Sequence, residues 1–319
     1  PVEIHSVVLL SSLPLTCNAV PPIYRPKSGK SGKFFQSPVS GAERGKRLIS
    51  HETPLHLCQP GNGKSCGACC GIYNYADSSR SALEARLGLR TERFRRCVRG
   101  TADLPAFSIA IRDAEDQTRR FEEIYCCEYV GFLDADRSLV GCLLHPAQNG
   151  GVDMRDVSFY GQELCHGHLC PSHHFLSATE KGVVMDLLDD WYLYGLVVTD
   201  IDLVKEYLRH ISDSLGETPD RAWFREGPAR VVARRFFSLK LTWPFRSDEV
   251  RRFGRFYFDG SQHMIRPIDY AALGCERSRY DGIFLSLSSE FHNHADVELA
   301  ERMIRENIEA LVALWETPP

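Results

Sequence analysis

The sequence has no run of about 18 consecutive apolar residues, which excludes an ordinary transmembrane helix. It also has little excess charge. Its formal net charge is −4 over 319 residues, so no overall attraction to nucleic acid or to anionic membranes is expected. A nucleophile elbow, a metalloprotease motif and a dinucleotide fingerprint are all missing. Nevertheless, 43% hydrophobic and 25% charged residues is the composition of an ordinary globular protein.

Cysteine is the residue type that stands out. The chain has 12 cysteines, and 10 of them fall between residues 58 and 170. Because an evenly used structural residue would be scattered, this clustering indicates that something draws the thiols together. The ten are Cys58, Cys66, Cys69, Cys70, Cys97, Cys126, Cys127, Cys142, Cys165 and Cys170.

Composition divides the chain into three parts. Residues 1–50 are rich in Pro, Ser, Gly and Lys, which predicts a flexible N-terminal tail. Residues 51–176 carry the cysteines and predict an irregular metal-binding domain with short strands and a hairpin. Residues 177–319 have helical spacing and predict a mainly helical C-terminal region. The expected fold class is therefore α+β.

Local patterns in the cysteine region favour short strands. Strands are expected at 107–111 and 120–130, and residues 131–145 have the pattern of a hairpin. On a strand, neighbouring side chains alternate, so Cys126 is expected to pack on the opposite face from Cys127. The arginine-rich segment 90–99 is expected to form a solvated face with some salt bridges.

The C-terminal region has stronger helical signals. Residues 177–180 form a capping-box pattern, and the segments 201–215 and 296–315 have clear amphipathic spacing. The alternation of apolar residues over 237–243 instead favours a strand.

The focal motif is Cys66-Gly-Ala-Cys69-Cys70-Gly71. Two thiolates separated by two residues can hold one tetrahedral ion, because a tight turn directs both sulfur atoms inward. The glycines permit the backbone conformations that such a turn needs. A disulfide between the adjacent Cys69 and Cys70 would be strained. A second group of cysteines strengthens the prediction of a metal site: Cys126, Cys127, Cys142, Cys165 and Cys170.

These motifs resemble the CxxCxxCC cysteine-cluster family (YkgJ-like), a group of zinc- or iron-chelating domains. The resemblance covers about residues 58–176. Residues 65–70 look like the second half of the family motif, and the segments that begin at Cys127, Gly141 and Cys170 look like its later parts. The ligands that this resemblance implies are Cys66, Cys69, Cys70, Cys127, Cys142 and Cys170, with Cys165 as an addition.

The chain departs from the family pattern at one position. The first cysteine of the family motif would fall at Gly63, which cannot be a ligand. Cys58, five residues earlier, is the candidate substitute. Without it one coordination position is lost, so the number of metal atoms cannot be carried over from the family.

The ligand types leave the metal open between an iron–sulfur cluster and zinc. Seven or more cysteines exceed the four ligands of one zinc ion, and they suit one [4Fe–4S] cluster with spare thiols or two zinc ions. Ligand softness favours the cluster. However, His166 and His168 have an i, i+2 spacing that suits metal binding on an extended segment, although exposed loop histidines are the simpler interpretation.

The expected function is a metal-binding protein whose centre has a redox or group-transfer role, and whether it is an enzyme stays open. One alternative is a non-catalytic, zinc-stabilised module that binds a protein partner. Another is a secreted disulfide-rich protein, although disulfide density normally belongs to chains under about 80–100 residues. A cytoplasmic location is expected, because thiols stay reduced there and remain available for metal. The low net charge and the lack of a long apolar run predict that neither nucleic acid nor a membrane is a partner.

Overall fold

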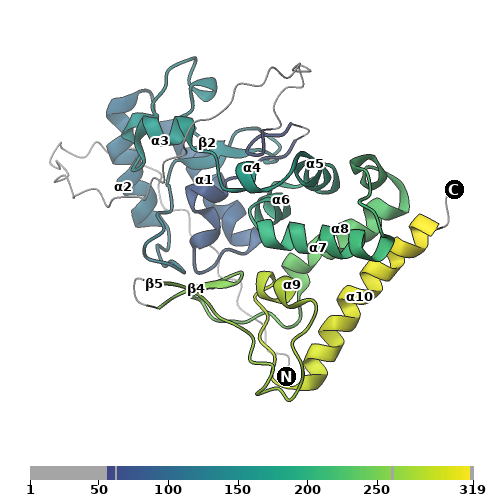
Figure 1. Cartoon of the computed structure of the whole chain (residues 1–319). Coiled ribbons are helices and arrows are strands. Elements are labelled where there is room, and N and C mark those ends of the chain that lie inside the picture. Colours follow the sequence, from purple (N-terminus) through teal and green to yellow (C-terminus); the bar gives the residue numbers. More distant parts are fainter. Residues whose placement is uncertain (1–55, 62, 260–261, 317–319) are drawn as a thin grey trace, which may run out of the picture. The chain divides into compact units, whose positions relative to one another are not determined.

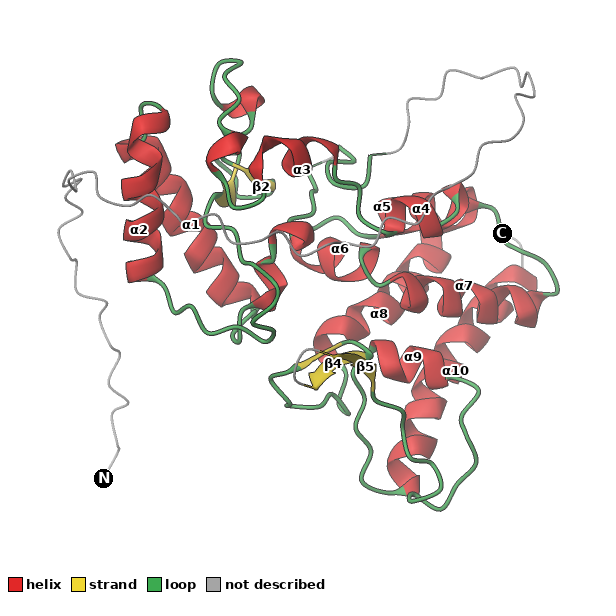
Figure 2. Ribbon diagram, turned by 60° about the vertical axis from the view of Figure 1, so that its left-hand side comes forward, coloured by secondary structure: helices red, strands yellow, loops and turns green. Residues whose placement is uncertain are grey.

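A computed structural model describes residues 56–316, apart from residues 62 and 260–261. These residues belong to one compact unit. The unit has an α+β fold, in which many helices accompany two small antiparallel sheets (Figures 1 and 2). The predicted tail, residues 1–50, lies outside the described residues. Among the helices that are described, none has the length and apolar character needed to cross a membrane.

The first half of the described chain carries short elements around one pair of longer helices. Helices α1 (Arg80–Cys97) and α2 (Leu104–Ala114) precede a hairpin formed by β1 (Val130–Phe132) and β2 (Val140–Cys142). The other elements of this half are η1 (Ala68–Cys70), η2 (Ile72–Asn74), η3 (Thr101–Asp103), η4 (Pro146–Gln148), η5 (Arg155–Val157), α3 (Gly161–Gly167) and α4 (Ser172–Phe175).

The second half is mostly helical, as its sequence predicts. The long helix α10 packs against α7 and α8 (Figure 1). A three-stranded antiparallel sheet with the order β3-β4-β5 lies between α8 and α9 in the sequence. The elements are α5 (Ala178–Leu187), α6 (Trp191–Val198), α7 (Ile201–Leu215), η6 (Arg221–Phe224), α8 (Gly227–Thr242), β3 (Arg252–Phe253), β4 (Phe256–Asp259), β5 (Gln262–Ile265), α9 (Asp281–Ser286) and α10 (His294–Glu316).

Buried apolar side chains form two clusters. One cluster is built from the cysteine region, and it also contains Trp191 and Tyr192 of α6. The other is built from α5 to α10, and it also contains Leu57 from the start of the cysteine region. Each cluster therefore includes side chains from the other half, which packs the cysteine region against the helical region.

The predicted capping box at the start of α5 is present. The Ser177 hydroxyl accepts a hydrogen bond from the Glu180 N–H at 3.2 Å, and the Ser177 N–H donates to the Glu180 carboxylate at 2.6 Å. Both bonds satisfy N–H groups that have no partner within the helix. The predicted helices at 201–215 and 296–315 are α7 and α10.

Two predicted strands are wrong. Both segments are helical, because their alternating apolar residues also fit the spacing of a helix face. Residues 107–111 lie in α2, whose buried residues Leu104, Phe107 and Ile111 follow a three- and four-residue spacing. Residues 237–243 lie largely in α8, where burial likewise follows a helical face rather than every second residue. Tertiary packing decides between the two periods when an apolar run is short.

The strand expected at 120–130 is also largely absent. Only Val130 belongs to β1, and most of the segment consists of turns. The side-chain amide of Asn74 makes hydrogen bonds to this segment in place of those that a neighbouring strand would make. It donates to the carbonyl oxygens of Phe121 and Ile124 at 2.9 and 2.8 Å, while its own oxygen accepts from the Phe121 N–H at 3.0 Å.

Arg90 corrects the prediction of a solvated arginine face. Arg95, Arg96 and Arg99 are exposed, but the Arg90 side chain is 1% exposed. It donates to the Glu115 carboxylate at 2.7 and 2.5 Å. A charge run on a helix therefore does not show which members turn inward to a buried partner.

Replacing Glu115 with Gln is expected to lower the free energy of unfolding by about 3 kcal/mol, because it leaves the buried Arg90 charge uncompensated. Urea unfolding measures the change. Glu309→Gln is the matched control, because Glu309 and Arg305 form an exposed pair at 3.8 Å. The control should cost no more than about 1 kcal/mol. Equal losses in the two variants would contradict the role given to the buried pair.

Candidate metal centre

The candidate ligands come from four short segments: the loop before η1 together with η1 itself, residues 126–127, β2, and the stretch from α3 to α4. Main-chain hydrogen bonds hold the first segment together and join it to the second. Within the first segment, the Cys66 N–H donates to the Cys58 carbonyl at 2.9 Å. The Cys127 N–H donates to the Cys70 carbonyl, also at 2.9 Å. The backbone therefore fixes how these segments meet.

Four thiols form what we call the first thiol set: Cys58, Cys66, Cys69 and Cys170. The Cys69 thiol donates a hydrogen bond to Cys170. Cys58 and Cys66 both lie within electrostatic reach of Cys170 and of each other. Cys58, the candidate substitute for the missing family cysteine, thus lies among the predicted ligands.

Four others form the second thiol set: Cys70, Cys127, Cys142 and Cys165. Cys70 lies within electrostatic reach of the other three, and Cys142 lies near both Cys127 and Cys165. Cys66 also lies near Cys70, so the two sets adjoin. The cysteines of both sets are free thiols.

The adjacent Cys69 and Cys70 belong to different sets. Cys69 contacts Cys170, whereas the thiols nearest to Cys70 are mainly those of the second set. Both residues lie in the single turn of η1, where neighbouring side chains point in different directions. The vicinal pair thereby links the two sets without forming a strained disulfide.

Burial favours the neutral thiol in the first thiol set. Burial, with neighbouring thiols adding to it, raises the pKa of Cys58 to about 11 and that of Cys66 to about 12. The hydrogen bond between Cys69 and Cys170 raises the pKa of Cys69 and lowers that of Cys170. A cation among these sulfur atoms would favour the thiolate forms instead.

Two charged groups, Glu128 and Arg90, lie near Cys127 of the second thiol set. Burial raises the pKa of Cys127, and the neighbouring Glu128 carboxylate raises it further. Although burial opposes it, hydrogen bonds from Ser108 and Tyr125 hold the pKa of Glu128 below its ordinary value. Arg90 acts in the opposite sense, because its guanidinium lowers the pKa of Cys127 and donates to the Cys127 carbonyl at 3.1 Å.

Gly71 allows the first two segments to approach closely. Its φ is +80°, and a Cβ at this position would overlap the Tyr125 carbonyl oxygen. The Gly71 carbonyl accepts a hydrogen bond from the Cys126 thiol at 3.2 Å. Glycine alone combines a left-handed φ with the absence of a Cβ, so the last residue of the cysteine motif has a structural role.

Cys126 belongs to neither set. Its buried thiol donates to Gly71, and its sulfur accepts a weak hydrogen bond from the Asn74 amide at 3.7 Å. Cys127 instead lies near Cys70 and Cys142. The two neighbours therefore have separate surroundings, as predicted, although they do not lie on a strand.

Three histidines of this region have other contacts or face solvent. The His145 Nδ1 accepts from the Ala147 N–H at 3.2 Å. The His166 Nδ1 lies 3.1 Å from the Arg155 guanidinium. His168 is exposed. Thus His166 and His168 are not drawn into either thiol set.

His173 differs from these histidines. Its Nε2 is buried and has no hydrogen-bond partner within the part of the chain that the structure describes. The main-chain N–H of His173 donates to the Cys170 carbonyl at 2.9 Å, so this residue lies beside the first thiol set. A buried orphan nitrogen costs free energy unless something binds it.

Sequence patterns do not reveal three further residues of the site. Lys64, between Cys58 and Cys66, buries its side chain and donates to the Met185 carbonyl. The hydroxyl of Tyr194 lies near the first thiol set, and that of Tyr160 near the second. Neither tyrosine belongs to a cysteine motif, so only the fold brings them there.

Between residues 56 and 316, excluding the undescribed positions, no three side chains of His, Cys, Asp or Glu lie close enough together to hold a metal ion. Metal binding would therefore have to draw sulfur atoms of each set closer by side-chain rotation.

Comparisons with protein-family models, with curated proteins and with solved structures find no match to this chain. The resemblance to the CxxCxxCC family thus rests on the cysteine motifs alone.

Replacing Gly71 with Ala is expected to lower the free energy of unfolding, because the new Cβ meets the Tyr125 carbonyl and the left-handed φ is also strained. Gly216→Ala is the matched control. It has a φ of +76° and nothing within 4 Å of the added Cβ. Urea unfolding should show a loss at Gly71 at least about 2 kcal/mol larger than at Gly216. Similar losses would remove the close approach as a constraint.

Proposed function

We propose that this protein holds thiolate-bound metal in its two thiol sets, with iron–sulfur clusters of the [4Fe–4S] type favoured over zinc. The observation that carries the proposal is that eight free cysteines lie within electrostatic reach of one another, and we divide them into two adjoining groups of four. Four thiolates are the full protein ligand set of one [4Fe–4S] cluster, and they are equally a complete tetrahedral zinc site.

The donor chemistry supports iron–sulfur over zinc. Both thiol sets are made of sulfur, the softest donor among protein side chains. The nearby His145 and His166 have other hydrogen-bond partners, which leaves few imidazoles for the mixed sites that zinc often occupies. The orphan Nε2 of His173 suits a hydrogen bond to cluster sulfur, although it would also suit a zinc ligand.

The surrounding residues would tune such a centre. A bound [4Fe–4S] cluster would supply one-electron transfer, with a potential set by local charge, hydrogen bonding and solvent exposure. Beside the second thiol set, Arg90 contributes buried positive charge and Glu128 contributes buried negative charge. Tyr160 lies near the second thiol set and Tyr194 near the first, where their rings would adjoin the bound centres.

A structural zinc module is the second candidate function. It is favoured by the irregularity of the ligand segments, since the elements around the thiols are mostly single turns or three-residue strands. Such segments gain little from their own hydrogen bonds, and a metal ion would contribute folding free energy directly. A secreted disulfide framework has less support, because the cysteines of both sets are free thiols and only Cys97, outside both sets, is disulfide-bonded among the described cysteines.

Metal and acid-labile sulfide should be measured on protein purified without oxygen, together with a visible spectrum. The proposal expects iron and sulfide in equal amounts and broad absorption near about 400 nm. Colourless protein with about two zinc ions per chain would favour the structural module instead. Protein with neither metal, and with its thiols oxidised to disulfides, would overturn both.

Two single substitutions test the division into two sets. Cys170→Ser removes a ligand of the first thiol set and Cys142→Ser one of the second, so each variant is expected to lose about half of the bound metal. Cys126→Ser and Cys275→Ser are matched controls that should retain all of it, because Cys126 lies outside both sets and Cys275 packs against the C-terminal cluster. Complete loss in both ligand variants would indicate one shared centre.

A further inference from the structure

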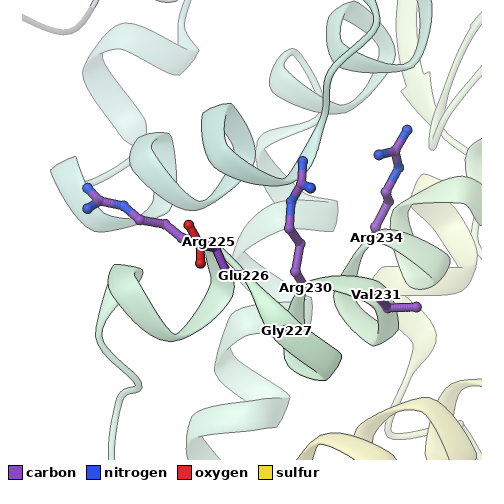
Figure 3. Close-up of a pocket in the computed structure, with 6 residues that line it drawn as sticks. All are labelled: Arg225, Glu226, Gly227, Arg230, Val231 and Arg234. Atoms are coloured by element: carbon purple, nitrogen blue, oxygen red, sulfur yellow. The ribbon is translucent and has the colours of Figure 1, made fainter.

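An open cavity of about 470 Å³ lies over the N-terminal half of α8, away from the cysteine motifs in the sequence (Figure 3). Arg230 and Arg234 extend from α8 in the same direction, while Arg225 extends from the preceding turn. Its volume falls in the range of small-molecule sites, about 300–1,000 Å³. The lining residues are Arg225, Glu226, Gly227, Arg230, Val231 and Arg234.

Positive charge exceeds negative charge around this cavity. Two aspartates, one near the end of α5 and one in the segment between α5 and α6, balance only part of it. Asp186 pairs with Arg225 at 3.1 Å, and Asp189 pairs with Arg230 at 2.8 Å and with Arg234 at 2.6 Å. Arg221, which pairs with Asp186, and the buried Lys64, 4.0 Å from Asp189, add two more cations outside the lining. With Glu226 counted, this group holds five cations and three carboxylates, an excess of two positive charges.

Several donors at the cavity are available to a ligand. The two Nη atoms of Arg225, one Nη atom of Arg230 and one of Arg234 make no hydrogen bond within the described part of the chain. Helix α8, 16 residues long, begins at Gly227 without a side-chain cap. Pro228 has no N–H, but the other N–H groups of the first turn, which starts at Gly227 in the lining, and the positive end of the helix dipole lie at this cavity.

We propose that this cavity binds a phosphate dianion, either free or as the phosphate group of a small phosphomonoester. Guanidinium groups match the geometry of phosphate oxygens in paired hydrogen bonds, and an uncapped helix start adds backbone donors. The excess of two positive charges matches one dianion. Asp189 holds Arg230 and Arg234 in position when the cavity has no ligand, and it competes with phosphate for them.

The lining of this cavity contains no residue of either thiol set. Its arginines come from α8 and the turn before it, and only Lys64, outside the lining, belongs to the cysteine region. Phosphate binding and metal content are therefore separate measurements, and either can fail without the other.

Isothermal titration calorimetry of the purified full chain with inorganic phosphate, and separately with glycerol phosphate, tests the proposal. A dissociation constant of about 1 mM or tighter is expected for at least one of them at low ionic strength. Tighter binding of glycerol phosphate would assign a phosphomonoester, and tighter binding of inorganic phosphate would assign the free ion. Acetate, which is planar and carries one charge, should bind at least about tenfold more weakly.

Two variants should move the affinity in opposite directions. The double variant Arg230→Gln and Arg234→Gln is expected to weaken phosphate binding by at least about tenfold, because charge-assisted donors are lost. Asp189→Asn is expected to tighten it by about fivefold, because the internal competitor becomes neutral. Arg209→Gln is the matched control, since Arg209 forms an exposed pair on α7 and should leave the affinity unchanged.

Thermal unfolding distinguishes a variant that has lost the phosphate site from one that has lost its fold. Each variant should unfold cooperatively, and added phosphate should raise the Tm of the parent and of Asp189→Asn but not that of the double arginine variant. No binding to the parent, or equal affinities in the parent and the double variant, would overturn the proposal.

Discussion

The close approach of Gly71 to the backbone at Tyr125 and Cys126 is the contact on which the cysteine region depends. It lets the Cys127 N–H reach the Cys70 carbonyl, and this bond holds together two segments more than fifty residues apart in the chain. Around this junction the regular structure is sparse. The hairpin adds the third segment and the stretch from α3 to α4 adds the fourth, so the other candidate ligands gather around the two segments that this glycine-dependent crossing joins.

The sequence identified the region in which the cysteines gather, but it did not predict how they would group in the fold. The excess of cysteine and the motif at Cys66–Gly71 identify the region, and the capping box and amphipathic spacing identify α5, α7 and α10. The division into two sets could not be predicted, because their members interleave along the chain: Cys69 and Cys70 are neighbours but separate, whereas Cys58 and Cys170 come together. Only tertiary structure determines such a pairing.

Charged residues show the same limit of local patterns. Arg90 lies in a run of arginines yet is buried against Glu115, while the arginines of α8 gather around a cavity that no sequence motif marks. Burial of an arginine depends on whether a distant carboxylate reaches it. Short apolar runs fail for a related reason, because residues 107–111 fit a strand or a helix until their neighbours in the fold are known.

The interleaving of the two sets has a consequence for biosynthesis. Each set takes its last member from the stretch between Cys165 and Cys170, although the other members lie up to 112 residues earlier in the first set and up to 95 in the second. Neither set is complete on a nascent chain until this stretch has been translated, and both become complete within five residues of one another. Metal delivery to this protein would thus be a late event, and a chain truncated before residue 165 would carry six of the eight thiols with both centres unfinished.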